Sequence, residues 1–362
     1  MRDVYLCSEN KTDLSIEISN REIEILSGLH TLVSHKMGKS DSLKGYSIYI
    51  GIPFCPTTCL YCSFPSYSRA SYTGKVQLYL EALKKEIHEV AVLMKDRILD
   101  TVYIGGGTPT ALSHSELDEL FQYLYQELPM EGVHEFNVEA GRPDSITREK
   151  LEVMKKHHVS RISINPQTMN QKTLKLIGRH HTIEQLRESF AMAREMGFDN
   201  INMDLILGLP GETKEDVLYT FKEVEKMAPD SMTVHSLAVK THSRLREQWE
   251  EYKSYVFENS DEFMRYANET AEKLGMKPYY LYRQKQMVGN LENVGFSVPG
   301  KEGLYNILIM EEQQDIVALG AGTSSKKVFL DGSTGRCENV KDVDTYIERI
   351  DLMIERKREL FS

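Results

Sequence analysis

Apolar and polar positions follow two patterns that alternate along the chain. Short apolar runs of strand type occur at residues 46–50, 101–104, 135–138, 160–164, 200–205 and 231–234. Between these runs the apolar residues recur at helical spacing, as in Val76, Leu80, Leu83, Ile87 and Val90. Strands that alternate with helices predict βαβ units and a parallel sheet, so we expect an α/β fold.

Two of the expected helices carry clear start signals. Ser113 with Glu116 and Thr182 with Gln185 have the spacing of capping boxes. In parallel α/β barrels the carboxyl ends of the strands meet at one mouth, which is where such proteins place their chemistry. Polar residues that directly follow a strand are therefore the first candidates for a functional site.

The C-terminal third has a pattern of its own. We expect a helix after Ser260, strands near 279–282, 305–309 and 316–319, a hairpin turn at 331–335 and a last helix carrying Val343 to Ile354. We interpret this region as a small α/β domain that covers the open side of a partial barrel. The expected domains are a short N-terminal segment, 1–45, the barrel, 46–240, and the C-terminal domain, 241–362.

Composition narrows the class of protein. Hydrophobic residues make up 41% of the 362 positions, yet no apolar run approaches the length of a membrane span, so we expect no membrane association. A formal net charge of −10 argues against a nucleic-acid surface. The first ten residues contain no apolar signal region, and we therefore expect a cytoplasmic protein.

Three cysteines directly after the first expected strand carry the strongest chemical signal. Cys55, Cys59 and Cys62 have the spacing C-x3-C-x2-C. With five cysteines in all, the chain is too poor in cysteine for a disulfide scaffold, and no second C-x2-C completes a zinc site. Three thiolates can hold three irons of a [4Fe–4S] cluster and leave the fourth iron open for a small molecule. Cys7 and Cys337 stand alone and are interpreted as ordinary thiols.

A glycine-rich turn follows the second expected strand. Gly105, Gly106 and Gly107 precede Thr108. Such a turn lets backbone approach a ligand closely and can offer N–H groups to an anion. Further polar groups follow the next strands: Glu139 after the third, Gln167 after the fourth, Asp204 near the end of the fifth, and Arg179 after a short helix. Together they predict a lined pocket at the mouth.

These motifs make the chain similar to a known family. It resembles the oxygen-independent coproporphyrinogen III dehydrogenase-like branch of the radical S-adenosylmethionine (SAM) proteins, whose fold is a partial (β/α)6 barrel. The resemblance rests on Tyr49 with Ile52 to Cys55, Gly105 to Thr110, Glu139, Ser163 to Gln167, Arg179 and Asp204 to Pro210. The stretches 139–143 and 289–295 are similar to the Z-type variant.

The resemblance implies cofactors, a reaction and partners. Cys55, Cys59 and Cys62 would bind the [4Fe–4S] cluster. The positions that match SAM contacts are Tyr49, Tyr61, Gly107, Thr108, Glu139, Gln167, Arg179 and Asp204. The family reaction is the oxidative decarboxylation of two propionate side chains of coproporphyrinogen III to vinyl groups. It implies a tetrapyrrole substrate and an electron donor of flavodoxin or ferredoxin type.

Two departures keep other functions open. Gly51 stands where the best-studied enzymes have histidine, and Phe64 stands where they have a further cysteine. Relatives with an aromatic residue there include haem chaperones and haem-degrading methyltransferases, so both remain alternatives. The candidate clamps for substrate carboxylates are Lys240, Arg244, Arg283, Lys285, Lys326 and Lys327; the candidate haem ligands of a chaperone are His180, His181, His235 and His242.

Overall fold

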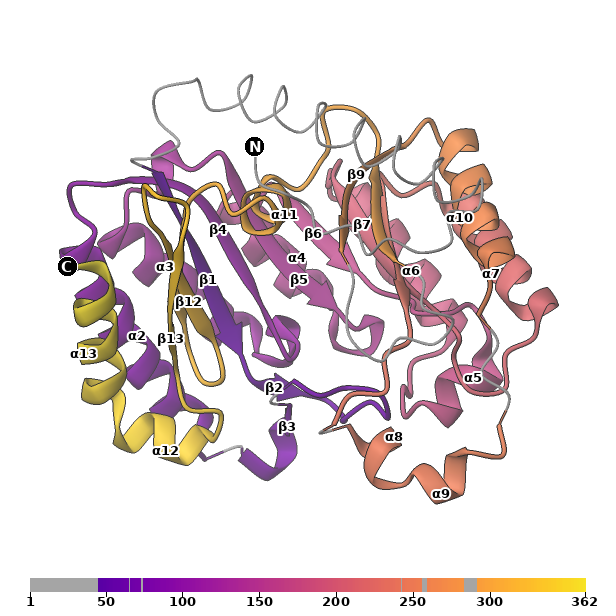
Figure 1. Ribbon diagram of the computed structural model, residues 1–362, viewed down its shortest axis with the longest axis horizontal. Helices are drawn as coiled ribbons and strands as arrows, with labels where there is room; N and C mark the ends of the chain where they lie inside the picture. Colours follow the sequence, from indigo (N-terminus) through magenta and orange to yellow (C-terminus); the bar gives the residue numbers. More distant parts are fainter. Residues whose placement is uncertain (1–44, 65, 73, 242, 256–258, 283–291) are drawn as a thin grey trace.

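The computed structural model describes residues 45–64, 66–72, 74–241, 243–255, 259–282 and 292–362. Among these residues the main sheet has the strand order β13-β12-β11-β1-β4-β5-β6-β7-β8-β10-β9 (Figure 1). Its central strands are β1 (Gly45–Ile52), β4 (Ile98–Gly106), β5 (Glu135–Gly141), β6 (Arg161–Ile164), β7 (Ile201–Leu207) and β8 (Ser231–Ser236). They pair in parallel, one after the other, as the alternating sequence pattern predicts.

Helices connect the central strands in the βαβ manner. They are α2 (Val76–Leu93), α3 (His114–Glu127), α4 (Arg148–Lys156), α5 (Gln171–Leu176), α6 (Ile183–Glu195) and α7 (Lys214–Met227). Both expected capping boxes are present, at Ser113 with Glu116 and at Thr182 with Gln185. The sheet remains open within the described residues, since β13 and β9 are its edges, and the expected partial (β/α)6 arrangement is confirmed.

The two faces of the central sheet differ in chemistry because side chains alternate along each strand. Ile48, Ile50, Val102 and Ile104 are fully buried in the main hydrophobic core, together with residues of the connecting helices such as Leu83. The opposite, concave face carries the polar and aromatic residues described below.

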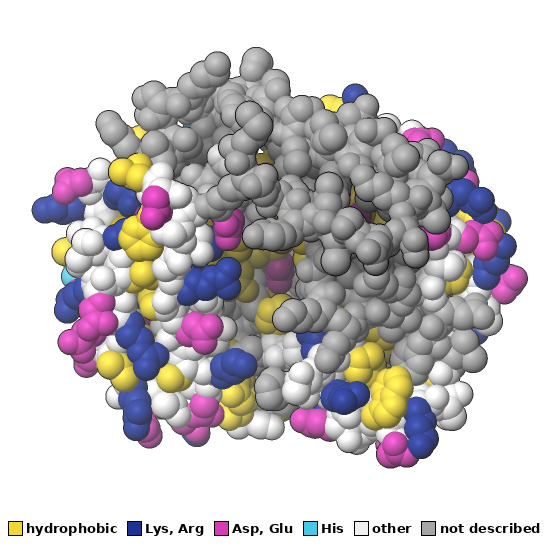
Figure 2. Space-filling model, in the orientation of Figure 1, with side chains coloured by type: hydrophobic (Ala, Val, Ile, Leu, Met, Phe, Trp, Pro, Cys, Tyr) yellow, Lys and Arg dark blue, Asp and Glu magenta, His cyan; other side chains and the backbone are white. Residues whose placement is uncertain are grey.

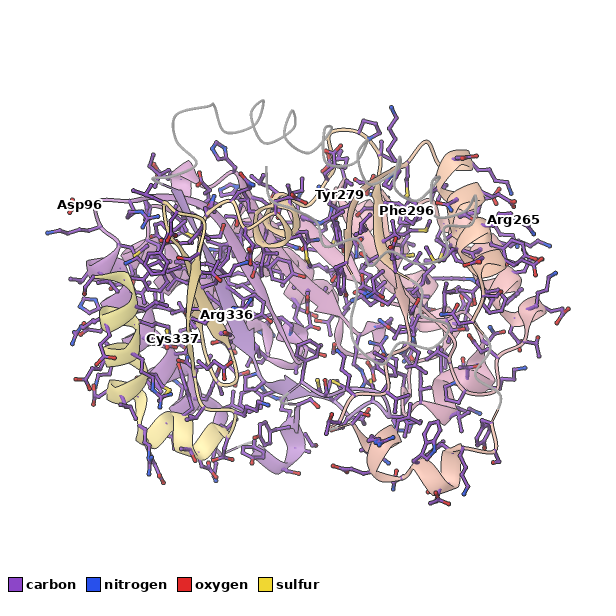
Figure 3. All side chains as sticks on the ribbon, viewed as in Figure 1. Asp96, Arg265, Tyr279, Phe296, Arg336 and Cys337 are labelled. Atoms are coloured by element: carbon purple, nitrogen blue, oxygen red, sulfur yellow. The ribbon has the colours of Figure 1, made fainter. Side chains whose placement is uncertain are left out.

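The C-terminal third adds strands to both edges of the same sheet. Its elements are α8 (Arg244–Glu247), α9 (Trp249–Tyr252), α10 (Asp261–Lys273), β9 (Lys277–Tyr282), β10 (Asn293–Ser297), α11 (Leu304–Met310), β11 (Asp315–Leu319), β12 (Ser324–Val328), β13 (Thr334–Glu338), α12 (Val343–Glu348) and α13 (Ile350–Phe361). Strand β10 pairs antiparallel with β8, and β11 pairs in parallel with β1. Tyr279 of β9 and Phe296 of β10 lie near one edge of the sheet, and Cys337 of β13 lies at the opposite edge (Figure 3).

One expected strand is wrong. Residues 305–309 belong to the helix α11, whose buried residues Leu304, Tyr305, Ile307 and Leu308 follow helical spacing. The carboxylate of Glu135 accepts hydrogen bonds from the backbone N–H groups of Leu304 (2.7 Å) and Tyr305 (3.1 Å). This carboxylate stabilises the start of the helix, and a short apolar run does not reveal such a partner.

The end of the chain differs in a smaller way. The expected last helix is divided at Arg349 into α12 and α13. The expected hairpin turn at 331–335 joins the antiparallel strands β12 and β13. No helix in the described portion of the chain is long and apolar enough to cross a membrane.

Candidate functional site

The cysteine segment lies at the carboxyl end of β1. Cys55 belongs to β2 (Phe54–Cys55), which pairs with β3 (Tyr67–Ser68), and Cys59 and Cys62 follow in the loop. All three thiols are free; Cys55 and Cys59 are buried and Cys62 is partly exposed. Burial raises the pKa of Cys55 to about 11. Burial, followed by the neighbouring Cys59, also raises the pKa of Cys62.

The glycine-rich turn after β4 holds this segment in place. The N–H of Gly107 donates to the carbonyl of Ile52, and the N–H of Thr108 donates to the carbonyl of Phe54, both at 2.8 Å. The hydroxyl of Thr108 lies 3.4 Å from the sulfur of Cys55. Because these two N–H groups are used within the protein, contacts of Gly107 and Thr108 with a ligand would have to come from their other atoms.

Arg142 clamps the cysteine loop from the end of β5. Its Nη1 donates to the carbonyl oxygen (2.8 Å) and the hydroxyl (2.7 Å) of Thr57. Its Nε and Nη2 donate to the two carboxylate oxygens of Asp144. The hydroxyl of Thr57 in turn donates to the carbonyl of Gly178 at 2.9 Å. The loop is thereby tied to both β5 and the segment that follows α5.

Arg179 lies close to Cys59, the second cysteine of the motif. Burial disfavours its charge, but Tyr61 and Cys59 outweigh that cost and raise the pKa of the Arg179 guanidinium. Its Nη1 donates to the carbonyl of Asn165, whereas its buried Nε has no partner among the described residues. Burial also raises the pKa of Tyr61 well above its usual range. The expected residues Cys59, Tyr61 and Arg179 are therefore brought together.

Glu139 and Tyr103 meet on the concave face of neighbouring strands. The Tyr103 hydroxyl donates to Oε1 of Glu139. Burial raises the pKa of Glu139 to about 7, although the hydrogen bond from Tyr103 opposes that rise, and Asp204 adds to it. A Cβ on Gly105 would lie 3.0 Å from the Glu139 carboxyl carbon, so the glycine turn and the carboxylate are in close contact.

Asp204 and Gln167 are joined through the backbone. The N–H of Gln167 donates to the carbonyl of Asp204 at 2.9 Å. Gln167 has a φ of +66°, which is unusual for a residue with a side chain and is often found at functional sites. Burial opposes ionisation of Asp204, but the ring of His235, 3.9 Å away, and a hydrogen bond from Asn202 outweigh it and lower the Asp204 pKa.

Tyrosine rings line the concave face beyond these carboxylates. Tyr49 of β1 stacks on Tyr103 of β4 with centroids 5.7 Å apart, and Tyr305 of α11 lies 4.5 Å from Tyr103. On the other side the hydroxyl of Tyr282 lies 3.1 Å from Nδ1 of His235. The side chains of Asp204 and His235 keep 25% and 27% exposure, so this interior is accessible.

The remaining candidates from the sequence are dispersed. Lys326 and Lys327 lie on β12, where they bond to Ile309 and Ser362 carbonyl oxygens, away from the mouth. Lys240 and Arg244 lie beside the cysteine loop. His180 is exposed, whereas His181 is buried and neither of its ring nitrogens has a partner among the described residues. Cys7, His242, Arg283 and Lys285 fall outside the described residues.

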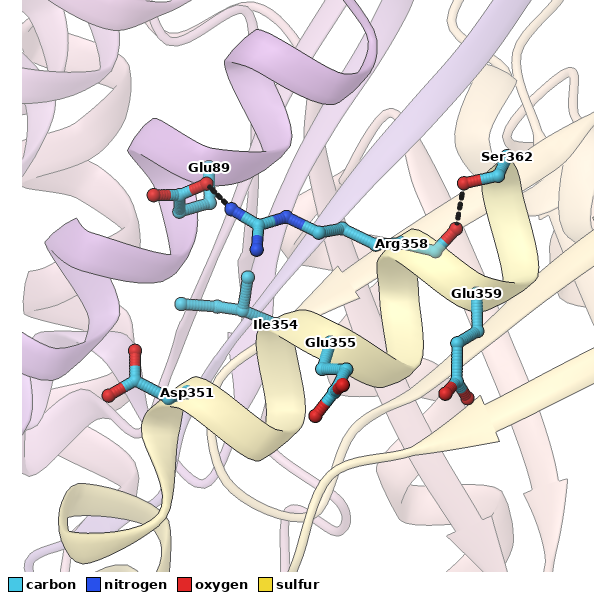
Figure 4. A pocket seen from close by; sticks show the side chains of 7 residues that line it. All are labelled: Glu89, Asp351, Ile354, Glu355, Arg358, Glu359 and Ser362. Atoms are coloured by element: carbon cyan, nitrogen blue, oxygen red, sulfur yellow. Dashed lines mark hydrogen bonds and ion pairs between the residues drawn. The ribbon is translucent and has the colours of Figure 1, made fainter.

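A separate hollow lies on the outer surface between α2 and α13 (Figure 4). Its volume is about 550 Å³. It is lined by Glu89, Asp351, Ile354, Glu355, Arg358, Glu359 and Ser362. None of the residues expected to act in a site takes part in it.

The residues at the mouth fit a cluster with an additional ligand. Within the described residues no three His, Cys, Asp or Glu side chains converge on a single-metal site. A cluster needs no such convergence, because each cysteine ligates a different iron. Three free thiols are available, the unpartnered Nε of Arg179 is buried beside Cys59, and a Cβ on Gly107 would lie only 3.0 Å from the sulfur of Cys55. The donor set and the close backbone approach both suit such a ligand.

Comparison with known proteins agrees with this geometry. Residues 49–224 match the family model described as the radical SAM superfamily. The chain is 42% identical over 359 residues to the oxygen-independent coproporphyrinogen-III oxidase-like protein HemZ of Bacillus subtilis, covering 98% of this chain and 69% of that protein. The chain belongs to the radical SAM superfamily, in the coproporphyrinogen III oxidase-like branch. The cofactors of this superfamily are a [4Fe–4S] cluster and SAM.

Two other known proteins are similar to this chain. The heme chaperone HemW of Bacillus subtilis is 39% identical over 194 residues, which cover 53% of this chain and 50% of that protein. The solved structure of coproporphyrinogen III oxidase (HemN) from Escherichia coli superposes with a TM-score of 0.69 at 22% identity, covering 87% of this chain and 71% of that one. At this identity the structural similarity shows the shared fold alone.

Sequence reasoning did not assign roles to several residues at the mouth. Tyr103 was within an expected strand, and its two-residue spacing from Gly105 could have placed it on the same face. Arg142 lies within the stretch 139–143 that supports the resemblance, yet only the fold shows its contact with Thr57. Tyr305 could not be placed because its segment was expected to be a strand.

Proposed function

We propose that this protein decarboxylates coproporphyrinogen III oxidatively, without oxygen, to protoporphyrinogen IX. When bound, the reduced cluster and SAM supply the radical chemistry that removes a hydrogen atom from the β-carbon of a propionate. Loss of CO2 and of one electron to an acceptor then leaves a vinyl group. The 42% identity to a coproporphyrinogen-III oxidase-like relative supports this assignment.

The residues at the mouth have separable roles in this proposal. Cys55, Cys59 and Cys62 bind the cluster. Glu139 accepts hydrogen bonds from the SAM amino group, and the free Nε–H of Arg179 donates to a SAM oxygen. Asp204 accepts from the ribose hydroxyls. Tyr61, partly buried beside Arg179, would pack against the adenine.

One observation carries the choice of substrate class. Tyr49, Tyr103 and Tyr305 form a stacked aromatic surface that begins at Glu139, on the same concave face as Asp204. A flat tetrapyrrole gains from a broad aromatic surface. Such a surface also excludes water from the reacting carbon.

A haem chaperone is the second candidate. His235 is partly exposed on the concave face, with Nδ1 near Tyr282, and a neutral histidine in this setting could ligate haem iron. The similarity to the chaperone HemW adds weight to this alternative. It predicts stable haem binding that His235→Ala weakens, without conversion of a porphyrinogen.

The two candidates are separated by one anaerobic assay. The protein is reconstituted with iron and sulfide, then incubated with SAM, dithionite, an electron acceptor and coproporphyrinogen III. Mass spectrometry follows 5′-deoxyadenosine and the porphyrin products. We expect protoporphyrinogen IX to form in step with 5′-deoxyadenosine.

The other outcomes are equally informative. SAM cleavage with unchanged coproporphyrinogen would contradict the proposed reaction. Stable binding of added haem, measured separately, would then support the chaperone. A methylated tetrapyrrole with S-adenosylhomocysteine would instead support a methyltransferase.

A further inference from the structure

Two segments around the cysteine loop are free of negative charge. Residues 51–80 and 231–246 contain no Asp or Glu, although the whole chain has a formal net charge of −10. The fold brings the two segments together, because the N–H of Leu245 donates to the carbonyl of Leu60 at 2.8 Å. The guanidinium of Arg244 also donates to the carbonyl of Thr58 at 3.4 Å. The surface beside the cluster site is thus positive on a negative protein.

Four residues form what we call the Phe64 patch: Phe64, Lys240, Arg244 and Arg246. The ring of Phe64 is 58% exposed, and Nζ of Lys240 lies 5.1 Å from its centroid. Both arginines are exposed, and none of the three cations forms an ion pair with a described residue. Figure 2 shows dark-blue side chains beside a yellow apolar area where Figure 1 places α8.

Acidic residues mark where the patch ends. Glu247, Glu250 and Glu251 follow it on α8 and α9, so its positive charge ends there. The remaining cations of residues 51–80 are already compensated, Arg69 by Glu116 and Lys75 by Asp344. The uncompensated positive charge is therefore concentrated around Phe64.

The patch adjoins the most accessible of the three cysteines. Cys62 is partly exposed, whereas Cys55 and Cys59 are buried. Phe64 follows Cys62 by two residues, so their Cα atoms lie at most about 7 Å apart. A protein that covers Phe64 would therefore lie next to the cluster.

We propose that the Phe64 patch is the docking surface for a small acidic one-electron carrier protein. The proposal rests on the proposed function, because cleavage of SAM needs one electron per event. The carrier loses that electron and the cluster gains it, with no bond made or broken. Opposite charge steers the carrier to the patch, and the exposed aromatic ring provides a contact that excludes water.

Binding to a purified acidic flavodoxin tests the proposal directly. The affinity of the reconstituted protein for oxidised flavodoxin is measured by calorimetry at low and high salt. Arg246→Glu and Lys240→Gln are compared with Lys95→Glu, an exposed lysine between α2 and β4 that precedes the amino end of β4, whereas the cysteine segment follows the carboxyl end of β1. We expect Arg246→Glu to weaken binding about tenfold, Lys240→Gln to weaken it less, and Lys95→Glu to leave it unchanged.

Activity separates this proposal from the proposed function. With dithionite as reductant, Arg246→Glu should cleave SAM at the wild-type rate; with reduced flavodoxin, it should need about tenfold more carrier for half-maximal rate. Equal affinities of wild type and Arg246→Glu for flavodoxin, or binding that salt does not weaken, would overturn the docking surface. Failure of the wild type to cleave SAM with dithionite would instead overturn the proposed function, whatever the calorimetry shows.

Discussion

The hydroxyl of Tyr103 donates a hydrogen bond to the carboxylate of Glu139, which lies on the neighbouring strand. Burial places the pKa of Glu139 at about 7, and this hydrogen bond keeps it from rising further. The ionised carboxylate is the form that would bind the SAM amino group. Affinity for SAM should therefore be present above that pKa and fall as the pH drops through it.

Removing the Tyr103 hydroxyl should move this pH dependence. In Tyr103→Phe the carboxylate loses a stabilising donor, so the Glu139 pKa should rise by about one unit. At neutral pH the ionised fraction, and with it SAM affinity, should fall about fivefold. The affinity for SAM is measured by titrating the reconstituted protein at a series of pH values. In Tyr103→Phe this affinity should recover about one pH unit higher than in the wild type.

A matched tyrosine provides the control for that experiment. The Tyr125 hydroxyl donates to the carbonyl of His157, away from the mouth, so Tyr125→Phe should leave the pH dependence of SAM binding unchanged. An unshifted profile in Tyr103→Phe would show that Glu139 does not bind SAM as an anion.

Gly107 should tolerate no side chain. A Cβ at this position would lie 2.7 Å from the carbonyl of Phe54 and 3.0 Å from the sulfur of Cys55, so the backbone beside the cluster must move. We expect Gly107→Ala to lose iron and SAM cleavage, measured after reconstitution. Gly132→Ala, where no atom lies within 4 Å of the added carbon, should behave like the wild type. Full iron content in Gly107→Ala would contradict the close approach.

Arg142 should act as a positioning residue for the cysteine loop. Arg142→Gln removes the clamp on Thr57 and leaves Asp144 without its cation. We expect affinity for cluster iron to fall about tenfold, as for other residues that orient metal ligands. Iron and sulfide content and the electron paramagnetic resonance of the reduced protein report the effect. Arg148→Gln, which removes an exposed ion pair with Glu195, is the control; a wild-type spectrum in Arg142→Gln would refute the clamp.

The C-terminal helix is docked through a buried charge pair. Lys357 of α13 bonds to Glu86 of α2 at 2.7 Å, and both side chains are almost inaccessible. Lys357→Met leaves a buried carboxylate unpaired and should lower the free energy of unfolding by about 3 kcal/mol. Lys85→Met, which breaks the exposed pair with Asp351 between the same helices, should cost at most about 1 kcal/mol. Thermal unfolding should rank the two variants in this order, and similar losses would contradict the account.

The sequence was sufficient to predict the barrel because the patterns that indicate its strands and helices are local. Alternating periods of apolar residues locate the central strands and the helices between them, and Ser113 and Thr182 mark helix starts. Cys55, Cys59 and Cys62 are close in sequence, so the role proposed for them could be inferred from their spacing. Glu139 and Asp204 were expected at or near strand ends; the structure places them within β5 and β7, whose parallel arrangement in one sheet still brings both to the same site.

The remaining features depend on contacts between distant residues. The helix at Leu304–Met310 is stabilised by Glu135, 169 positions before its first residue, so periodicity in the short segment could not reveal it. Arg142 meets Thr57 across 85 positions. The tyrosine surface joins β1, β4 and α11, which lie far apart along the chain.

The most direct test of the account is SAM cleavage by single cysteine variants. Reconstituted wild type, Cys59→Ser and Cys337→Ser are given SAM and dithionite without oxygen, and 5′-deoxyadenosine is measured. Cys337 is a free thiol on β13, far from the loop in the strand order, and serves as the matched control. The account predicts that wild type and Cys337→Ser form 5′-deoxyadenosine at similar rates and that Cys59→Ser forms none while remaining folded. Cleavage by Cys59→Ser at the wild-type rate would contradict the assignment of the cluster to Cys55, Cys59 and Cys62.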